Sequence, residues 1–461
     1  MYSYVLIILL IVAGLYFTFR TKFVQFRLFK ESVRLITEKP TDSSHVSSFQ
    51  ALMVSTASRV GTGNVVGVAN AIAIGGYGSV FWMWLIAIIG STSAFIESTL
   101  AQIYKQKDKQ GGCYGGPSYY IQKGLHSRSL GVIFSIALIA TYAIGFNMLA
   151  SFNLIDSLST YSFYDKFYVG DQNMVTIIGG LLLAVAVGIC VMGGGKRIVK
   201  ITGVLVPIMG IAYVLMACMV MILNIRALPE VLHHIFVSAF DFKAIFGGLA
   251  GSCIIQGIKR GLYSNEAGVG SAPNASASAT VSHPVKQGLV QMISVYIDTI
   301  LICTATAMMC LCTGIVPSSE LTGAQFVQTA LGQVFGGFGP IFISVALLLF
   351  AFTTLLGNLY YCEGCLNFIA NRTLSKNAMK VFYLFAALMV FVGAQLEFGL
   401  VWDIADVLMG IMTIINIPAI LIMGKYALRA LRDYQEQKAQ GKDPVFLAKN
   451  IGIEDKDTFW K

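Results

Sequence analysis

Long apolar runs recur along the whole chain, separated by short polar segments. An α-helix needs about 20 apolar residues to cross the hydrocarbon core of a bilayer, and scanning for such runs predicts about eleven membrane-spanning helices. They lie near residues 2–20, 50–74, 79–104, 130–158, 173–192, 201–224, 244–270, 288–313, 336–369, 379–396 and 404–424. The pattern therefore predicts an all-α polytopic membrane protein, and the odd number of helices puts the two termini on opposite sides of the bilayer.

Composition supports lipid as the main solvent. Of the 461 residues, 56% are hydrophobic and 12% are charged, whereas soluble chains carry about 25% charged residues. A soluble enzyme is therefore excluded. The net charge of +9 does not indicate nucleic-acid binding, because the basic residues form short clusters between apolar runs and no continuous basic face. Most of the nine cysteines lie within apolar runs, so disulfides are not implied.

The basic clusters predict the orientation. The first apolar run lacks a basic leader and a small-residue cleavage site, and a basic cluster follows it at once: Arg20, Lys22, Arg27, Lys30, Arg34 and Lys39. We interpret the run as a retained helix and not as a signal peptide. With the N-terminus outside and the C-terminus in the cytoplasm, most Lys and Arg residues become cytoplasmic, as expected in a bacterial-type inner membrane. The cytoplasmic segments would be 105–128, 196–200, 283–287, 371–380 and the tail from Lys425, while the opposite loops contain only Lys166, Arg226 and Lys243.

Glycine clusters in two of the apolar runs. One cluster is GTGNVVGV at 61–68, and the other is GGLAG at 247–251, continuing to NEAGVGSAP at 265–273. These are the second and seventh predicted helices, and paired interruptions of this kind are typical of inverted repeats with a binding site at the midplane. We therefore expect an N-terminal helix and connector (1–40), a first repeat of five helices (41–224), a second repeat of five (225–424) and a basic cytoplasmic tail (425–461).

The first glycine cluster predicts a ligand site. Its core is Gly61, Thr62, Gly63 and Asn64, and a helix broken there must face protein, water or a ligand, because unpaired backbone groups are not tolerated against lipid. Close helix packing is the simpler alternative, but Thr and Asn add donors and acceptors that packing does not need. A broken helix offers amides to a carboxylate and carbonyls to a cation, which suits a zwitterion travelling with sodium.

Charged residues flank both clusters. Glu266, next to Ser264 and Asn265 in the second cluster, is costly in a membrane and is therefore a functional candidate. The alternative is a brace that accepts hydrogen bonds from unpaired amides, and both roles stay open. Arg59 precedes the first cluster and needs an acidic or carbonyl partner, with Glu266 or Asp406 as candidates, so it is either a gate or a brace.

Other polar residues inside the apolar runs give weaker signals. Thr353 and Thr354 are adjacent hydroxyls in AFTTLLGN and could bind sodium, although a lone Thr in a membrane helix more often bonds to the preceding turn. Most of the remaining acids are expected to brace helices: Glu97, Asp156, Asp298, Glu363 and Asp406. The five histidines lack zinc-hydrolase spacing, and the C-x-x-C at 362–365 has no second pair, so neither indicates a metal site.

Several long motifs carry a family resemblance. VGTGNVVGVANAIAIGGYGSVFWMW at 60–84, RGLYSNEAGVGSAPNASA at 260–277 and HPVKQGLVQMISVYIDTILICTATA at 283–307 resemble signatures of the alanine or glycine:cation symporters, also called sodium:alanine symporters. Further similar segments are GGPSYYI at 115–121, GGGKRIVKITGVLVPIMGIAY at 193–213, AFTTLLGNLYYCEGCLNFI at 351–369 and DIADVLMGIMTIINIPA at 403–419. The resemblance is collinear and covers essentially the whole chain.

This resemblance implies a leucine-transporter-like fold of five-plus-five inverted repeats with one extra helix, working by alternating access with sodium or sometimes protons. It implies a secondary importer of alanine or glycine with no cofactor besides the coupling ion. The implied substrate contacts are Gly61, Thr62, Gly63, Asn64, Ala150, Phe152, Gln256, Thr354 and Asn358. Sodium would be bound by Thr353, Thr354 and the carbonyls of Ala57 and Val60, and the gating or bracing residues would be Arg59, Glu97, Ser264, Asn265 and Glu266.

Two positions depart from the family pattern. Many members carry Gln where this chain has Ala150, and Trp where it has Asn358. The pocket is therefore expected to be roomier or differently polar, and D-alanine, D-serine, serine and glutamine stay open as substrates. A proton-coupled carrier that uses Glu266 or Asp298 is the alternative of the same class. A channel would need filter repeats or charge rings, which the sequence does not show. The expected partners are the amino acid, sodium and the lipid bilayer, with no obligate protein partner.

Overall fold

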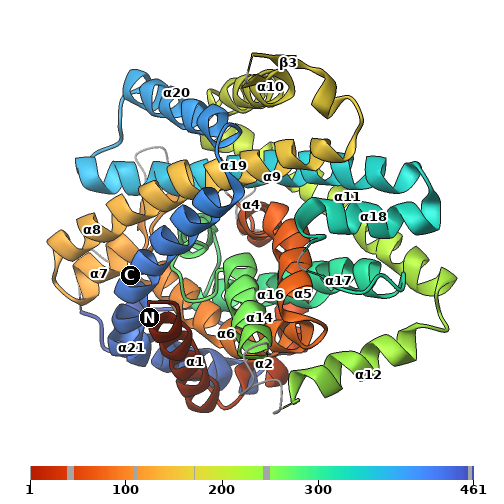
Figure 1. Ribbon diagram of the computed structural model, residues 1–461. Helices are drawn as coiled ribbons and strands as arrows, with labels where there is room; N and C mark the ends of the chain where they lie inside the picture. Colours follow the sequence, from red (N-terminus) through yellow and green to blue (C-terminus); the bar gives the residue numbers. More distant parts are fainter. Residues whose placement is uncertain are drawn as a thin grey trace.

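The computed structural model describes residues 2–38, 46–107, 112–170, 172–241, 250–318, 320–454 and 459–460. Helices dominate it (Figure 1). The first half contains α1 (Tyr2–Arg20), α2 (Val24–Arg27), α3 (Phe29–Ile36), α4 (Ser48–Arg59), α5 (Val68–Gly75), α6 (Gly78–Ile103), α7 (Pro117–Gly124), α8 (Arg128–Ile139), α9 (Asn147–Asp156), α10 (Met174–Val191) and α11 (Gly194–Leu223). The second contains α12 (Leu228–Ala239), α14 (Ala250–Asn265), α15 (Pro273–Ser278), α16 (Pro284–Val295), α17 (Thr304–Leu311), α18 (Gly323–Phe335), α19 (Phe338–Ala370), α20 (Lys376–Gly393) and α21 (Phe398–Ala439).

Short π-helical, 3-10 and strand segments complete the chain. The π-helical segments η1 (Gly63–Gly67), η2 (Ala140–Phe146) and η5 (Tyr296–Cys303) continue directly into α5, α9 and α17. The 3-10 turns are η3 (Ser157–Thr160), η4 (Tyr164–Lys166) and η6 (Ala448–Ile451). Strands β1 (Gln106–Lys107) and β2 (Cys113–Tyr114) form one antiparallel pair, and β3 (Tyr168–Val169) and β4 (Gln172–Asn173) form another.

The predicted membrane helices are confirmed in position. Among the described residues, eight helices are long and apolar enough to cross a membrane, and Val5–Arg20 and Gly63–Gly75 are shorter apolar helices. The seventh predicted run matches α14 and the break after it, but its beginning, including Gly247 and Gly248, lies outside the described residues. The total of eleven spans and the division into two five-helix repeats stay predictions.

The helices form a core surrounded by apolar outer helices. Helices α4, α5, α14 and α16 lie at the centre of Figure 1, whereas α10, α12 and α20 lie at the periphery. The outer helices expose large apolar side chains, such as Leu182 of α10 and Val381 of α20. Every side chain of α16, in contrast, is buried. Exposed apolar residues on the outside and polar residues inside are what a lipid solvent requires.

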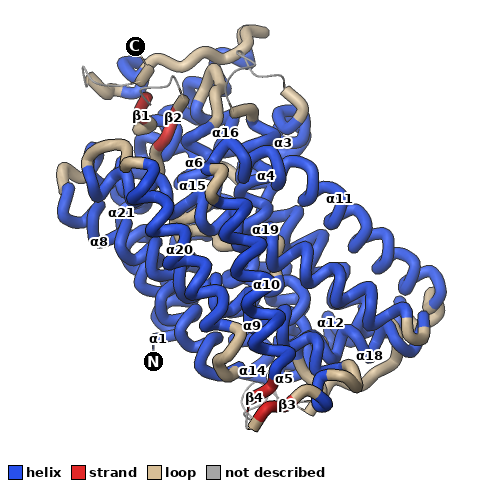
Figure 2. Tube along the Cα trace, turned by 90° about the horizontal axis from the view of Figure 1, so that it is seen from above, coloured by secondary structure: helices blue, strands red, loops and turns tan. Residues whose placement is uncertain are grey.

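The two ends of the bundle differ in what they carry. Figure 2 places the C-terminus, β1, β2 and α3 at one end, and the N-terminus, β3 and β4 at the other. We call the first end the tail face and the second the opposite face. The segment that follows α21, residues 440–454 with 459 and 460, lies on the tail face.

Helix α3 is tied to α21 on the tail face. Glu31 of α3 accepts hydrogen bonds from the Tyr434 hydroxyl (2.6 Å) and from Arg34, and it pairs with Lys438 (3.0 Å). Burial tends to raise the pKa of Glu31, but hydrogen bonds from Arg34, Tyr434 and Lys438 outweigh burial and lower the pKa from 4.5 to about 2. The carboxylate is therefore charged at neutral pH and holds α3 against α21.

Both predicted helix interruptions are confirmed. Helix α4 ends at Arg59, and the chain becomes helical again at Gly63. Helix α14 ends at Asn265, after which Gly268 and Gly270 have φ values of 84° and 93°, and α15 begins at Pro273. These two glycines occupy the left-handed region that disfavours other residues. Residues 60–68 and 263–279 are buried throughout, so protein encloses both breaks.

Candidate functional site

The first break releases two backbone carbonyls. In a continuous α-helix the amides of Gly61 and Asn64 would donate to the carbonyls of Ala57 and Val60. Here the Gly61 amide donates to Asn64 Oδ1 (2.8 Å), and the Asn64 amide donates to the Gly61 carbonyl (3.2 Å). The Asn64 side chain thus stabilises the break, and it leaves the Ala57 and Val60 carbonyls available at the C-terminal end of α4, where the helix dipole is negative.

A hydroxyl of α19 contacts one of these carbonyls. Thr354 Oγ1 donates to the Ala57 carbonyl at 3.0 Å. A Cβ atom at Gly61 would lie 2.3 Å from Thr354 Oγ1, so only glycine allows α19 to approach so closely. The oxygens are neutral and belong to a carbonyl and hydroxyl set, which suits a monovalent cation. Oxygens of this type are the ones that sodium binds, and sodium binding by Ala57, Val60 and Thr354 stays a prediction.

Thr353 lies differently from its neighbour. Its hydroxyl donates to the Leu349 carbonyl (2.9 Å) and the Phe350 carbonyl (3.2 Å) within α19. This is the back-bonding that competes with ligand binding by a Thr in a membrane helix. The structure thus brings Thr354 to the first break and keeps the Thr353 hydroxyl on its own helix.

The side of the first break that faces α9 carries the predicted substrate contacts. Asn153 Nδ2 donates to Thr62 Oγ1 (3.0 Å), which connects α9 to the break. A Cβ atom at Gly63 would lie 2.5 Å from the ring of Tyr263, so the break and α14 are also in close contact. Ala150 is buried on α9, between the levels of Asn147 and Asn153.

Asn358 is part of an amide network. It accepts from Ser58 Oγ (2.7 Å) on α4, and its Nδ2 donates to Asn147 Oδ1 (3.0 Å) on α9. Asn147 Nδ2 and Ser151 Oγ are buried and have no hydrogen-bond partner among the described residues. Buried polar groups are nearly always paired, so these two atoms are candidates to bind a polar ligand group.

Asp298 of η5 connects the two breaks. Its carboxylate accepts from Asn64 Nδ2 (2.7 Å), Ser264 Oγ (2.7 Å) and Thr299 Oγ1 (2.8 Å). Asn64 belongs to the first break, and Ser264 lies two residues before the second break begins. Asn265 Nδ2 contacts Thr299 Oγ1 at 3.3 Å, which adds a further bond between α14 and η5. The bonds from Asn64 and Ser264 to one carboxylate therefore connect the two breaks.

The second break is held by two carboxylates. Glu266 Oε2 accepts from Ser271 Oγ (2.6 Å), across the unwound segment. Glu97 of α6 accepts from the Gly268 amide (3.4 Å) and from Asn416 Nδ2 (2.9 Å), and Asn416 also donates to the Gly268 carbonyl. These contacts support the bracing role expected for Glu97 and Glu266.

Arg59 is buried at the end of α4 without an ion pair among the described residues. Its Nη1 donates to Ser294 Oγ and, at 3.5 Å, to the Gln291 carbonyl, both on α16. The guanidinium also lies close enough to Glu97 and Glu266 to attract them electrostatically. Asp406, the other acid considered for Arg59, pairs instead with Lys259 at 2.6 Å.

An aromatic cluster packs against the first break, where Tyr263 adjoins Gly63 and Trp402 adjoins Gly67. The Tyr263 ring contacts Phe146 (4.8 Å between centroids) and Trp402 (5.0 Å), and the Arg260 guanidinium stacks on Trp402 at 4.0 Å. The predicted contact Phe152 lies near this group through Phe398. The Phe398 ring is 6.1 Å from the Phe152 ring and 6.1 Å from Trp402, between centroids. Gln256, in contrast, lies beside Gly75 at the far end of α5 and not beside the first break.

Several residues of the site were not among the sequence candidates, and Asn147, Asn153, Tyr263 and Trp402 are examples. Asn147 and Asn153 could have been found as two amides within an apolar run. Tyr263 and Trp402 have no such signal, because aromatic residues are common throughout membrane helices.

Comparison with known proteins decides the family. The sodium:alanine symporter family matches residues 1–448. The chain belongs to this family. The amino-acid carrier protein AlsT of Bacillus subtilis is 44% identical over 452 residues, which cover 98% of this chain and 94% of AlsT. The probable sodium/glutamine symporter GlnT of the same organism is also 44% identical, covering 98% of this chain and 93% of GlnT.

A solved structure supports the predicted fold. The crystal structure of MhsT in complex with L-phenylalanine matches this sodium:alanine symporter family member with a TM-score of 0.57 and 14% identity, covering 89% of this chain and 93% of MhsT. This likeness shows the leucine-transporter-like fold. The family resemblance stated from the motifs is thereby confirmed, and the chain is a membrane transporter and not an enzyme.

Proposed function

We propose that this protein is a sodium-coupled symporter that imports a small neutral amino acid, with alanine or glycine as the first candidates. The observation that carries the proposal is the first break, where the Ala57 and Val60 carbonyls lose their helical amide donors and the Thr354 hydroxyl contacts the Ala57 carbonyl. They form an uncharged oxygen site next to a break whose residues Thr62 and Gly63 face α9 and α14. A sodium ion and a zwitterion together need no fixed countercharge in such a site.

Coupling follows from the position of the cation site. Sodium held by Ala57, Val60 and Thr354 would fix the bend at the end of α4, and the same bend positions Thr62 and Gly63 for the substrate. The two ligands therefore favour the same arrangement of the first break. Coupling free energies between sites are typically about 1–3 kcal/mol, which corresponds to about 5- to 150-fold in affinity, and they are reciprocal.

The protein would lie in the plasma membrane with the tail face in the cytoplasm. The tail face carries α3 and β1, whereas β3 and β4 lie at the opposite face (Figure 2). Lys105 directly precedes β1, Lys286 contacts Asp443 of the segment after α21, and Lys30 and Arg34 belong to α3. An excess of Lys and Arg on the cytoplasmic side is the general rule for membrane proteins. Import would then proceed from the opposite face toward the tail face.

An amino acid with an uncharged polar side chain, such as serine or glutamine, is the second candidate substrate. It is favoured by Ala150 and Asn358, which differ from the common family pattern, and by the unpaired atoms of Asn147 and Ser151. A substrate hydroxyl or amide could satisfy these atoms, whereas the methyl group of alanine could not. The substrate ascribed to GlnT by its name, glutamine, is of this class.

The variant Ser151→Ala separates the two substrate classes. If Ser151 binds a polar side chain, the variant should weaken binding of serine or glutamine about fivefold, because a neutral hydrogen bond is worth about 1 kcal/mol. Binding of alanine should stay within twofold of the wild type. Equal loss for all substrates would remove Ser151 from the specificity site.

Sodium dependence of substrate affinity tests the proposed coupling. Substrate affinity of the purified protein is measured at rising sodium concentrations, with choline replacing sodium so that ionic strength is constant. The proposal expects affinity to rise by about 5-fold or more. Affinity that ignores sodium but follows pH would instead favour the proton-coupled alternative that uses Asp298 or Glu266.

A further inference from the structure

The segment between α15 and α16, residues 279–283, connects the second break to the tail face. Helix α15 follows the break directly and is only six residues long, and α16 begins at Pro284. Residues 279–283 must therefore move whenever α15 moves relative to α16. Any opening of the second break toward the tail face depends on how firmly this connector is held.

The end of α6 and the residue Val46 hold the connector by hydrogen bonds. Gln102 Nε2 at the end of α6 donates to the Ser276 and Ala279 carbonyls (2.5 and 2.9 Å), and Lys105 Nζ donates to the Ala279 carbonyl at 3.0 Å. The Thr280 amide donates to the Val46 carbonyl (3.0 Å), just before α4. The connector is thus bonded to both α6 and the entry to the first broken helix.

The C-terminal segment covers the connector. The Phe446 amide donates to the Ser282 carbonyl (3.0 Å), and Ser282 Oγ donates to the Pro444 carbonyl (2.9 Å). His283 Nε2 lies 3.1 Å from Asp433 Oδ2 of α21, and the His283 ring packs between Tyr434 and Phe446 at centroid distances of 5.1 Å each. Residues separated by 150 or more positions in the sequence therefore lie side by side.

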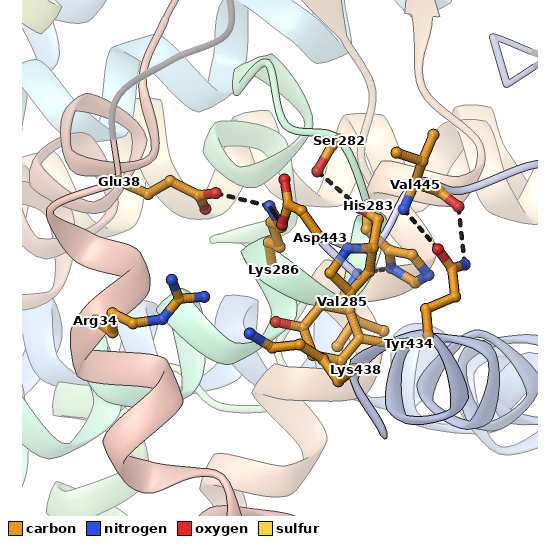
Figure 3. A network of polar contacts seen from close by, with 12 residues as sticks. Arg34, Glu38, Ser282, His283, Val285, Lys286, Tyr434, Lys438, Asp443 and Val445 are labelled. Carbon is orange, nitrogen blue, oxygen red and sulfur yellow. Dashed lines mark hydrogen bonds and ion pairs between the residues drawn. The ribbon is translucent and has the colours of Figure 1, made fainter. Parts of the chain in front are cut away.

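Lys286 joins three separate segments at this point. Its Nζ lies 2.7 Å from Glu38, just after α3, and 2.9 Å from Asp443 of the C-terminal segment. Figure 3 shows the amine between the two carboxylates, with Ser282 and His283 beside it. The Lys286 side chain is only 2% exposed, so loss of an acidic partner leaves a nearly buried ammonium less well compensated.

The C-terminal segment makes a second attachment further along. Trp460 Nε1 donates to the Gln102 carbonyl at 2.7 Å, and its ring lies 4.6 Å from Lys105 Nζ. Gln102 and Lys105 are the residues that hold the Ala279 carbonyl. Both ends of the C-terminal segment therefore act on the same short connector.

We propose that residues 443–454, with 459 and 460, are a clasp that positions the connector 279–283 and keeps the second break closed toward the tail face, with Lys286 as the positioning residue that joins the clasp to Glu38. Release of the clasp is then a required step each time the transporter opens toward the tail face. The role concerns opening and closing, so it goes beyond the proposed function and does not depend on which amino acid is carried.

A native cysteine reports the opening. Cys365 of α19 is 1% exposed, and its Sγ lies 3.9 Å from Asn274 Oδ1 of α15, so movement of α15 would uncover it. Cys310 of α17 is fully buried and serves as the internal control. The rate of N-ethylmaleimide alkylation of each cysteine is measured by peptide mass spectrometry on the full-length protein in lipid nanodiscs.

Two variants are compared. Asp443→Asn removes one charge of the clasp, and Glu436→Gln is the matched control. Glu436 is an exposed acid of α21 whose side chain forms no hydrogen bond or ion pair with the connector among the described residues. An ion pair made by an exposed residue is weak, and Asp443 is 67% exposed. Loss of the Asp443–Lys286 ion pair should therefore raise the Cys365 alkylation rate only moderately, by about fivefold. A chain ending at residue 442 should raise the rate further.

The outcomes separate a gate from a general structural role. Faster alkylation of Cys365 alone in Asp443→Asn, with Glu436→Gln like the wild type, supports the clasp. The proposal is overturned if Asp443→Asn alkylates Cys365 at the wild-type rate, or if Cys365 and Cys310 become reactive together, which would indicate general loosening. The single substitution decides the question if the shortened chain does not fold. Failure of sodium-dependent binding would leave these rates unaffected, so the two proposals fail independently.

Discussion

Replacing Thr354 by Val tests the cation site directly. The change keeps the volume of the side chain and removes the hydroxyl that lies 3.0 Å from the Ala57 carbonyl. A neutral hydrogen bond is worth about 1 kcal/mol, and a buried group left unpaired costs about 1–3 kcal/mol. Loss of about 1.4 kcal/mol of cation binding corresponds to a tenfold weaker affinity. We therefore expect the half-saturating sodium concentration of Thr354→Val to rise about tenfold.

The adjacent hydroxyl supplies the control. Thr353 donates to carbonyls of its own helix, so Thr353→Val should change the half-saturating sodium concentration less than twofold. Sodium-dependent uptake of labelled substrate into proteoliposomes measures both variants, at equal amounts of folded protein. An unchanged sodium requirement in Thr354→Val would refute the assignment of the site. Equal loss in both variants would show that both hydroxyls bind the ion, as the sequence predicts.

Three further predictions concern specificity, the link between the breaks and pH. Ala150→Gln and Asn358→Trp restore the common family residues, and competition assays should show selectivity moving toward alanine and glycine; no change from either would remove these positions from the pocket. Asp298→Asn removes a carboxylate that accepts from three donors and should lower the free energy of unfolding by about 2 kcal/mol, seen as a lower thermal midpoint. Uptake should stay sodium-dependent. Uptake that no longer depends on pH and is no longer coupled to an ion gradient would instead indicate proton coupling through Asp298. The depressed pKa of Glu31 contributes stability that is present above its ordinary pKa of 4.5 and is lost as pH falls toward 2. The difference in thermal midpoint between wild type and Glu31→Gln should therefore shrink between about pH 5 and pH 3, and a difference independent of pH would contradict the ionic role.

The helices and both breaks could be predicted because lipid imposes strong rules on sequence. A span needs a long apolar run, and unpaired backbone in a membrane must be enclosed by protein or line a cavity. Gly61 and Gly63 therefore marked the first break, and Gly268 and Gly270 marked the second. The structure confirms both interruptions.

The details of the site depend on contacts that no local pattern encodes. The carbonyls of Ala57 and Val60 are released because the Asn64 side chain folds back to the Gly61 amide, which a sequence of residue types does not reveal. Thr353 and Thr354 are adjacent and chemically identical, and only the packing of α19 against α4 distinguishes them. These choices are made by tertiary packing.

The tail shows the same limit at longer range. Its charge predicts a cytoplasmic location, and the sequence gives no reason to connect Asp443 with Lys286. The contact arises because α21 ends beside α3 and α16 on the tail face, so that the following residues return over the connector. Such a contact becomes visible only when the helices are packed.

Uptake into proteoliposomes is the most direct test of the central claim. Labelled amino acids, including L- and D-alanine, glycine, serine and glutamine, are supplied outside, with and without an inward sodium gradient and with the pH held equal on both sides. The account predicts accumulation of at least one small neutral or uncharged polar amino acid that requires the sodium gradient. Accumulation driven by a pH gradient alone, with no response to sodium, would contradict it.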